Sequence, residues 1–227
     1  MLRAALAVAL LLGTPASRVA ADADRAEPFV ALTATFRTET RSRDKIEHRA
    51  WRLTRTPGQV EVEWLDDGWA DIWRLDHDGA LSLTKVSDSE RTFVEYAPNQ
   101  IRETRGAPSW RALNSVLPRH PSELGLRYAG KLEAMGQPAE RYVGTLGTKA
   151  ITIVWLARER LPYQLVTKGD GRTTELRLRG LSFAAPSMKK TRRLSAYRRL
   201  SAHDADPLQA LPAMPPPKRR PGVQIHF

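Results

Sequence analysis

The side chains that could do chemistry in this chain match no catalytic pattern. None of the five histidines has metal-ligand spacing to a second histidine or to a pair of carboxylates. The chain has no Gly-x-Ser-x-Gly elbow and no glycine-rich phosphate loop between a strand and a helix. Cysteine is absent, which excludes disulfides, thiolate nucleophiles and zinc-thiolate sites. We therefore expect a protein that is not an enzyme and that uses no cofactor or metal. The histidines are His48, His77, His120, His203 and His226.

Two acidic patterns have a structural explanation that we prefer. The run Asp76-His77-Asp78-Gly79 resembles the start of a calcium loop, but it lacks the glycine at position six and the glutamate at position twelve. An aspartate-glycine turn between two strands explains it better. Glu61 and Glu63 share one strand face and could form a carboxylate pair. We expect that face to be solvated, because Val60 and Val62 occupy the other one.

The aromatic residues are the feature of this sequence that most suggests a function. The chain has six tryptophans, and four of them lie between residues 51 and 73. Two interpretations remain open: an ordinary core, or a partly open apolar cavity that binds a ligand. The residues that we expect to line the inner face are Phe36, Trp51, Trp64, Leu83, Trp155 and Leu165.

The element that must position these side chains is a large antiparallel sheet. Apolar and polar residues alternate with a period of two from residue 29 to residue 183, which is typical of half-buried strands. Turn sequences such as Thr56-Pro57-Gly58 and Gly169-Asp170-Gly171 divide this stretch. The pattern predicts about ten to eleven strands and no βαβ unit. The expected strands are 29–41, 46–54, 60–65, 69–75, 80–86, 91–97, 124–133, 139–146, 149–157, 161–168 and 172–183.

A short helix interrupts this sheet. Ser109 is a suitable N-cap, and Pro118 and Pro121 end the helix after Leu117. Trp110, Leu113 and Leu117 would share one helix face. We expect this helix to lie over the concave face as a lid.

The two ends of the chain differ from the sheet. Residues 1–21 have the basic start, apolar block and small-residue pattern of a cleavable signal peptide, with cleavage after Ala21. We therefore expect a soluble protein outside the cytoplasm, without a lipid anchor because the chain has no cysteine. Residues 22–185 form the predicted sheet domain, and residues 186–227 form a basic, proline-rich tail with a short amphipathic helix at 189–202.

Most of the net charge of +11 lies in this tail, which has nine Lys or Arg residues after position 188 against Asp204 and Asp206. The sheet domain is nearly neutral, and this argues against nucleic-acid binding. A membrane-anchored protein or an anionic membrane surface is the partner that we expect for the tail. The candidate contact residues are Lys189, Lys190, Arg192, Arg193, Arg198 and Arg199.

Several short motifs resemble those of a known superfamily. They are Arg55-Thr56-Pro57, the strand 60–64 with its Trp64, Tyr96-Ala97-Pro98-Asn99, Gly136-Gln137-Pro138-Ala139, and Val154-Trp155-Leu156 followed by Leu161-Pro162. Over residues 29–183 the chain resembles the periplasmic lipoprotein-carrier superfamily with the LolA-like fold, which includes stress sensors and lipid carriers. The resemblance implies an unclosed antiparallel half-barrel that holds acyl chains, and a role in transport to the outer membrane.

We therefore expect a periplasmic carrier or sensor that binds a lipid, an acylated protein or another apolar ligand in the concave face. The alternative is an interaction protein that regulates a membrane-anchored partner through its body and basic tail. The residues do not identify the ligand, the partner or the oligomeric state.

Overall fold

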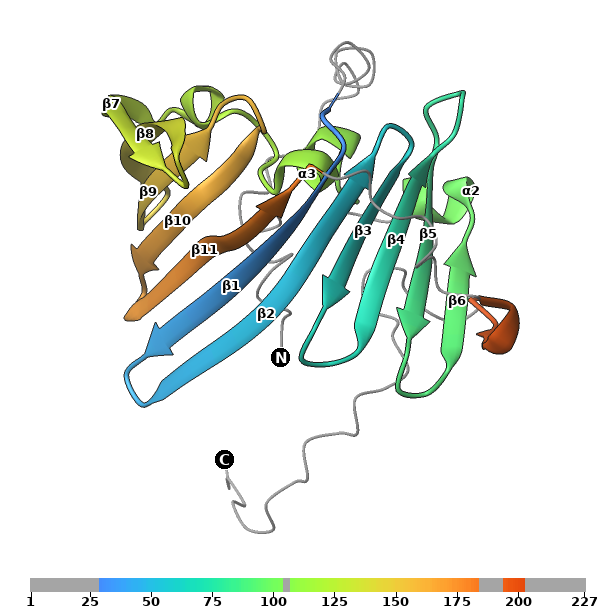
Figure 1. The fold of residues 1–227 in the computed structure, drawn as a ribbon. Helices are drawn as coiled ribbons and strands as arrows, with labels where there is room; N and C mark the ends of the chain where they lie inside the picture. The colour runs from blue at the N-terminus through green and yellow to red at the C-terminus, as the bar shows by residue number, and fades with distance from the viewer. Residues whose placement is uncertain (1–28, 104–106, 184–193, 203–227) are drawn as a thin grey trace.

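The computed structural model describes residues 29–103, 107–183 and 194–202. They form one twelve-stranded sheet with a few short helices (Figure 1). The strands are β1 (Leu32–Ser42), β2 (Lys45–Thr56), β3 (Gln59–Trp64), β4 (Trp69–Leu75), β5 (Leu81–Ser87), β6 (Thr92–Tyr96), β7 (Arg127–Ala134), β8 (Gln137–Leu146), β9 (Lys149–Leu156), β10 (Leu161–Gly169), β11 (Arg172–Ser182) and β12 (Arg198–Leu200).

The sheet consists of two meanders that meet in its centre. Strands β1 to β6 pair in sequence order, and so do strands β7 to β11. The two halves are joined by antiparallel pairing of β1 with β11, so the first and the eleventh strand are neighbours. The edge strands, β7 and β12, do not pair with each other. The predicted single, unclosed antiparallel sheet is therefore confirmed, and each of the eleven expected strands is present.

The hairpin turns follow from their residues. Met135 and Gly136 have φ angles of 54° and 71°, and Asp170 and Gly171 have φ angles of 54° and 68°. Two successive positive φ angles are what a tight two-residue hairpin requires, and glycine accepts such an angle without strain. The register of the second meander depends on these turns.

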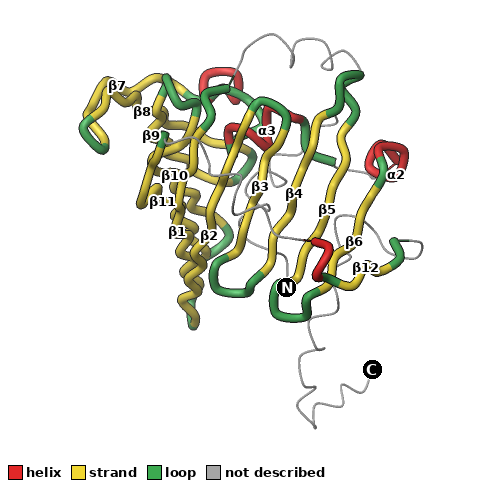
Figure 2. The backbone as a smooth tube through the Cα atoms, turned by 45° about the vertical axis from the view of Figure 1, so that its right-hand side comes forward, coloured by secondary structure: helices red, strands yellow, loops and turns green. Residues whose placement is uncertain are grey.

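The sheet is bent and not flat. Figures 1 and 2 show the strands β3 to β6 turned at an angle to β7 to β9, with β1 and β2 between them. The register shifts between Thr35 and Phe36 in β1, between Pro162 and Gln164 in β10, and between Tyr128 and Gly130 in β7. Such bulges increase the local twist and bend of a strand. The bend gives the sheet a concave inner face and a convex outer face.

The apolar core lies on the inner face. It is one continuous cluster that includes side chains from most strands and from the residues after β6. Outward positions carry ion pairs, such as Arg52 of β2 with Glu63 of β3. Glu61 is partly exposed and does not lie in the core, as expected for the outer face of β3.

The helices agree only in part with the prediction. The expected helix at 109–117 is present as α3 (Trp110–Ser115), capped by Ser109, whose side chain accepts a hydrogen bond from the Ala112 amide. Two further elements were not predicted: α2 (Pro98–Glu103) and the 3-10 turn η3 (Pro121–Leu124). Both are short, and each has only one buried side chain, which leaves no helical periodicity to detect.

The described part of the tail corrects one prediction. Residues 194–202 do not form the expected amphipathic helix. A 3-10 turn, η5 (Leu194–Ala196), precedes β12, which pairs in parallel with β6. The reason is non-local: a short isolated helix is marginally stable, whereas pairing with the open edge of β6 also packs Leu200 against the core. The predicted signal peptide, residues 189–193 and residues 203–227 lie outside the described residues.

Candidate functional site

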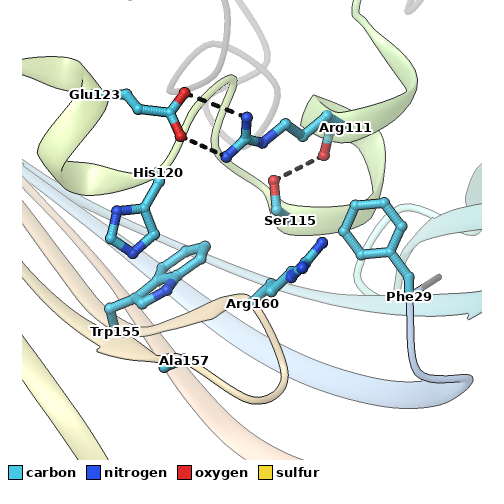
Figure 3. Close-up of a pocket in the computed structure, with 8 residues that line it drawn as sticks. All are labelled: Phe29, Arg111, Ser115, His120, Glu123, Trp155, Ala157 and Arg160. Atoms are coloured by element: carbon cyan, nitrogen blue, oxygen red, sulfur yellow. Dashed lines mark hydrogen bonds and ion pairs between the residues drawn. The ribbon is translucent and has the colours of Figure 1, made fainter. Parts of the chain in front are cut away.

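A pocket of about 210 Å³ lies where α3, η3 and the turn between β9 and β10 meet (Figure 3). Arg111 of α3 and Glu123 of η3 form a two-pronged ion pair above it, with N–O distances of 2.8 and 3.2 Å. The aromatic rings of Trp155 and Phe29 line it from opposite sides (Figure 3). The lining residues are Phe29, Arg111, Ser115, His120, Glu123, Trp155, Ala157 and Arg160.

His120 connects η3 to the sheet through contacts of its ring with two aromatic residues. Its ring lies edge-on to Tyr142 at 5.5 Å and to Trp155 at 5.7 Å between ring centroids. Nδ1 lies 2.8 Å from Ser122 Oγ and accepts a hydrogen bond from the Ser122 amide. This is the geometry of an N-cap, and no carboxylate in the described residues contacts the ring. The His120–Ser122 pair therefore has a structural explanation as the cap of η3.

Arg55 joins three parts of the chain inside the protein. Its side chain is buried, and its guanidinium donates to the main-chain carbonyls of Val30, Asn114 and Glu159. These carbonyls belong to the residues before β1, to α3 and to the turn between β9 and β10. We call these three hydrogen bonds the Arg55 latch. The Phe29 ring lies 5.2 Å from Arg55 Cζ, within the range of a cation–π contact.

The positive charge of Arg55 is buried, and burial disfavours the charged form of the side chain. Burial lowers the pKa of Arg55 to about 10, although the Glu159 carboxylate counteracts this shift. The guanidinium therefore remains charged at neutral pH, and its positive charge strengthens each hydrogen bond to a carbonyl.

The six predicted wall residues all belong to the buried core cluster. Phe36, Trp51 and Trp64 are direct cross-strand neighbours on β1, β2 and β3. The rings of Phe36 and Trp51 stack with centroids 4.4 Å apart. Trp155 is the wall residue that also lines the pocket of Figure 3. Leu83 and Leu165 lie in the same cluster, and ligand contact by these residues remains a prediction.

The three predicted lid residues are also in this cluster. Trp110, Leu113 and Leu117 are 8%, 4% and 0% exposed. Because Asn114 of the same helix accepts a hydrogen bond from Arg55, α3 is attached to the sheet by apolar packing and by the latch together.

Polar groups lie among the apolar side chains of β4 to β6. Asp71 and Lys85 are cross-strand partners, and Lys85 Nζ lies 3.3 Å from Asp71 Oδ1 with both side chains almost fully buried. Asp71 shares a strand face with Trp73, whose Nε1 is buried without a hydrogen-bond partner, as is Thr92 Oγ1 of β6.

Two of the six predicted tail contacts are described. Arg198 and Arg199 are exposed on β12, and Arg199 forms an ion pair with Glu95 of β6 at 3.0 Å. The other four, Lys189, Lys190, Arg192 and Arg193, lie outside the described residues. In the described part of the chain, no helix is long and apolar enough to cross a membrane, and no cluster of metal ligands occurs.

Solved structures with a similar fold include members of the superfamily that the sequence resembles. No family model and no curated protein matches the chain. MucB is similar over 78% of this chain and 61% of its own, with 15% identity and a TM-score of 0.46. A LolA superfamily protein from Nitrosomonas europaea is similar over 74% and 96%, with 9% identity and a TM-score of 0.36.

A DUF1329 family protein from Desulfovibrio piger is similar over 84% of this chain and 98% of its own, with 9% identity and a TM-score of 0.37. The chain spans less than two thirds of MucB and only 31% of PNGF-II, another structure with a similar sheet. A LolA superfamily protein is thus among the structures to which this chain is similar. At these identities and scores the likeness assigns no ligand or partner to this chain.

The sequence prediction missed the polar residues of the site. Arg55 stood in a turn motif, and nothing local indicated that it would be buried. For Asp71 and Lys85 a signal was available, because each lies two positions from inward residues and so shares their strand face. Asp71 shares a face with Trp69 and Trp73, and Lys85 shares a face with Leu83. A charged residue on the apolar face of two adjacent predicted strands indicates a buried ion pair.

Proposed function

We propose that this protein is a periplasmic, non-enzymatic carrier or sensor that binds a lipid, an acylated protein or another apolar ligand on the inner face of its sheet. The observation that carries the proposal is the Arg55 latch. One buried side chain holds α3 and two other segments over an aromatic inner face, so that a single set of contacts controls access to it.

The chemistry of the latch favours a reversible lid. Burying a charged side chain costs desolvation free energy, so a lid that needed only to stay closed could be held by apolar packing alone. Hydrogen bonds to main-chain carbonyls from one side chain can break together, and this would release α3 in one step.

The magnitudes allow an exchange between the closed and the loaded state. Three hydrogen bonds to a charged group contribute roughly 5–9 kcal/mol in total at 1.5–3 kcal/mol each, and the desolvation of the buried guanidinium offsets part of this. An acyl chain of about ten methylenes gains roughly 8 kcal/mol when it leaves water. The two terms are of similar size, so a bound chain could replace the latch at little net cost.

The polar groups on and near the inner face favour an amphiphile over a hydrocarbon. The pocket of Figure 3 is lined by Arg111, Arg160 and His120. The buried core of β4 and β5 contains the ion pair of Asp71 with Lys85 and the Nε1 atom of Trp73, which has no hydrogen-bond partner. A ligand with an apolar chain and a polar head matches both environments.

The test is ligand recovery and rebinding. Protein purified from its own periplasm is examined by native mass spectrometry, and delipidated protein is titrated with a lysophospholipid while tryptophan fluorescence is followed. We expect a bound amphiphile and a saturable change in emission. Leu165→Ala should weaken binding, whereas the outward variant Arg52→Ala should not. Protein that is always empty and shows no change in emission would contradict the proposal.

A second function rests on the exposed arginines of β12. Arg198 and Arg199 lie at the sheet edge next to the strongly basic tail. They could bind an acidic face of a membrane-anchored protein or anionic headgroups, at about 1 kcal/mol for each basic residue near such a surface. Binding to vesicles with 30% anionic lipid, compared between the full chain and Arg198→Glu/Arg199→Glu, tests this. Equal binding by both proteins would exclude these two residues as contacts.

A further inference from the structure

The two edges of the sheet are protected in different ways. Edge strand β7 carries a bulge at Gly130, where φ is 118°, and exposed charges at Arg127, Lys131 and Glu133. Both features discourage a further strand from pairing. Strand β6 has the sequence Thr-Phe-Val-Glu-Tyr, with a single charge and no proline or bulge in its pairing with β5. Such an edge pairs readily with another strand.

The chain covers this open edge with its own residues 194–202. Strand β12 pairs in parallel with β6, although the other ladders of the described sheet are antiparallel. Arg198 N donates to the Arg91 carbonyl at 2.9 Å, and Tyr197 Oη donates to Asp88 Oδ1 at 2.9 Å. Leu200 and Ala202 pack against the core cluster. These contacts form a compact and specific site for one short segment.

The connection to this segment is short for the distance it must cover. Six strands lie between β11 and β12, so the two are seven strand spacings apart, or roughly 34 Å along the sheet at about 4.8 Å each. Eleven peptide steps join Phe183 to Leu194, and they span at most roughly 36–40 Å. This reach exceeds the path along the sheet by only a few Å. A short connection favours exchange of the connected segment between two molecules.

We propose that residues 194–202 are exchangeable, and that β6 accepts this segment from a second copy of the chain. In the exchanged dimer each copy donates its β12 to the β6 edge of the other, with the same register and the same contacts. Because these contacts are identical in both forms, the equilibrium depends on the connection and on protein concentration. The proposal is independent of whether the inner face binds a lipid.

The absence of cysteine allows a direct test by disulfide trapping. Phe93 and Arg199 are register partners, and the ion pair of Arg199 with Glu95 places them on the outer face. A Phe93→Cys chain is mixed with an Arg199→Cys chain of different tag size and oxidised. A disulfide between the two chains, identified by mass spectrometry, forms only if one chain donates β12 to the other. The control replaces Arg199→Cys by Ile46→Cys, which is 57% exposed on β2 and not opposite β6.

Changing the length of the connection between β11 and residue 194 provides a second test of the exchange. Deleting residues 186–191 from both chains leaves a connection of at most roughly 18 Å, too short for the intramolecular form. We expect the trapped dimer to increase at least fivefold with the deletion, and to decrease below the natural level when six Gly/Ser residues are inserted instead. Leu200→Asp should abolish trapping in both backgrounds. Trapping no higher than in the Ile46→Cys control after the deletion, or trapping that survives Leu200→Asp, would overturn the proposal.

Discussion

The guanidinium of Arg55 donates a hydrogen bond to the main-chain carbonyl of Asn114, 59 residues further along the chain. This bond connects the end of β2 with α3. The same side chain reaches the Glu159 carbonyl, 104 residues away. One residue thus connects α3, the residues before β1 and the turn after β9.

Loss of the Arg55 latch should destabilise the protein strongly. In Arg55→Ala three main-chain carbonyls, two of them buried, lose their partner and a cavity remains, so we expect the free energy of unfolding in urea to fall by about 3–5 kcal/mol. Arg55→Met fills the space and should cost less, while α3 exchanges its amide hydrogens faster than in the natural protein. The control is Arg52→Ala, three residues away in an outward ion pair, which should cost less than about 1 kcal/mol. Equal losses in Arg55→Ala and Arg52→Ala would contradict the assigned role.

The buried pair Asp71–Lys85 should be more sensitive to single than to double replacement. Asp71→Leu leaves Lys85 as an uncompensated buried charge, and a loss of about 3–5 kcal/mol in the free energy of unfolding is expected. Asp71→Leu/Lys85→Met removes both charges and should recover most of that loss. The exposed pair Lys45–Glu47 on β2 is the matched control, with a coupling energy below about 1 kcal/mol in the same double-mutant cycle. A similarly small coupling for Asp71–Lys85 would show that the pair is not buried in solution.

The N-cap of α3 should contribute measurably to stability. Ser109→Ala removes the side-chain acceptor for the Ala112 amide, at a distance of 3.2 Å, and should cost about 1 kcal/mol. Ser109→Asp restores an acceptor and should retain the stability of the natural protein. Thermal unfolding followed by circular dichroism checks both variants. If Ser109→Asp is as unstable as Ser109→Ala, the hydrogen bond is not the cause.

Alkaline pH should destabilise the protein through Tyr142. Burial, together with the hydrogen bond from Tyr142 to Glu140, raises the pKa of this tyrosine to about 12, whereas an unfolded chain titrates near pH 10. Between these values the unfolded state has lost a proton that the folded state retains, so stability falls as pH rises from 10 to 12. In Tyr142→Phe this fall in stability should be smaller. The absorbance change at 295 nm from the tyrosine that ionises at the highest pH should also disappear. Tyr163→Phe is the control and should leave that late titration in place.

The regular part of the fold could be predicted from the sequence because its causes are local. Alternation placed Phe36, Trp51 and Trp64 on one face, and turn residues such as Gly171 marked the hairpins. The polar residues could not be found in this way, since the burial of Arg55 depends on Asn114 and Glu159, which lie far along the chain. The same holds for β12: its three residues have no period of their own, and only the open edge of β6 makes them a strand.

The pairing of β1 with β11 has a consequence for the order in which the chain can fold. Thr33 pairs with Ser182 across 149 residues, while nearly all other ladders join strands that follow each other directly. Contacts between such distant residues form late and slow the folding of a domain. Until β11 arrives, the eleven residues of β1 present a long unpaired edge in the middle of the future sheet. A chain cut short after Leu146 would keep that edge open permanently, and it should aggregate and not persist as half of the sheet.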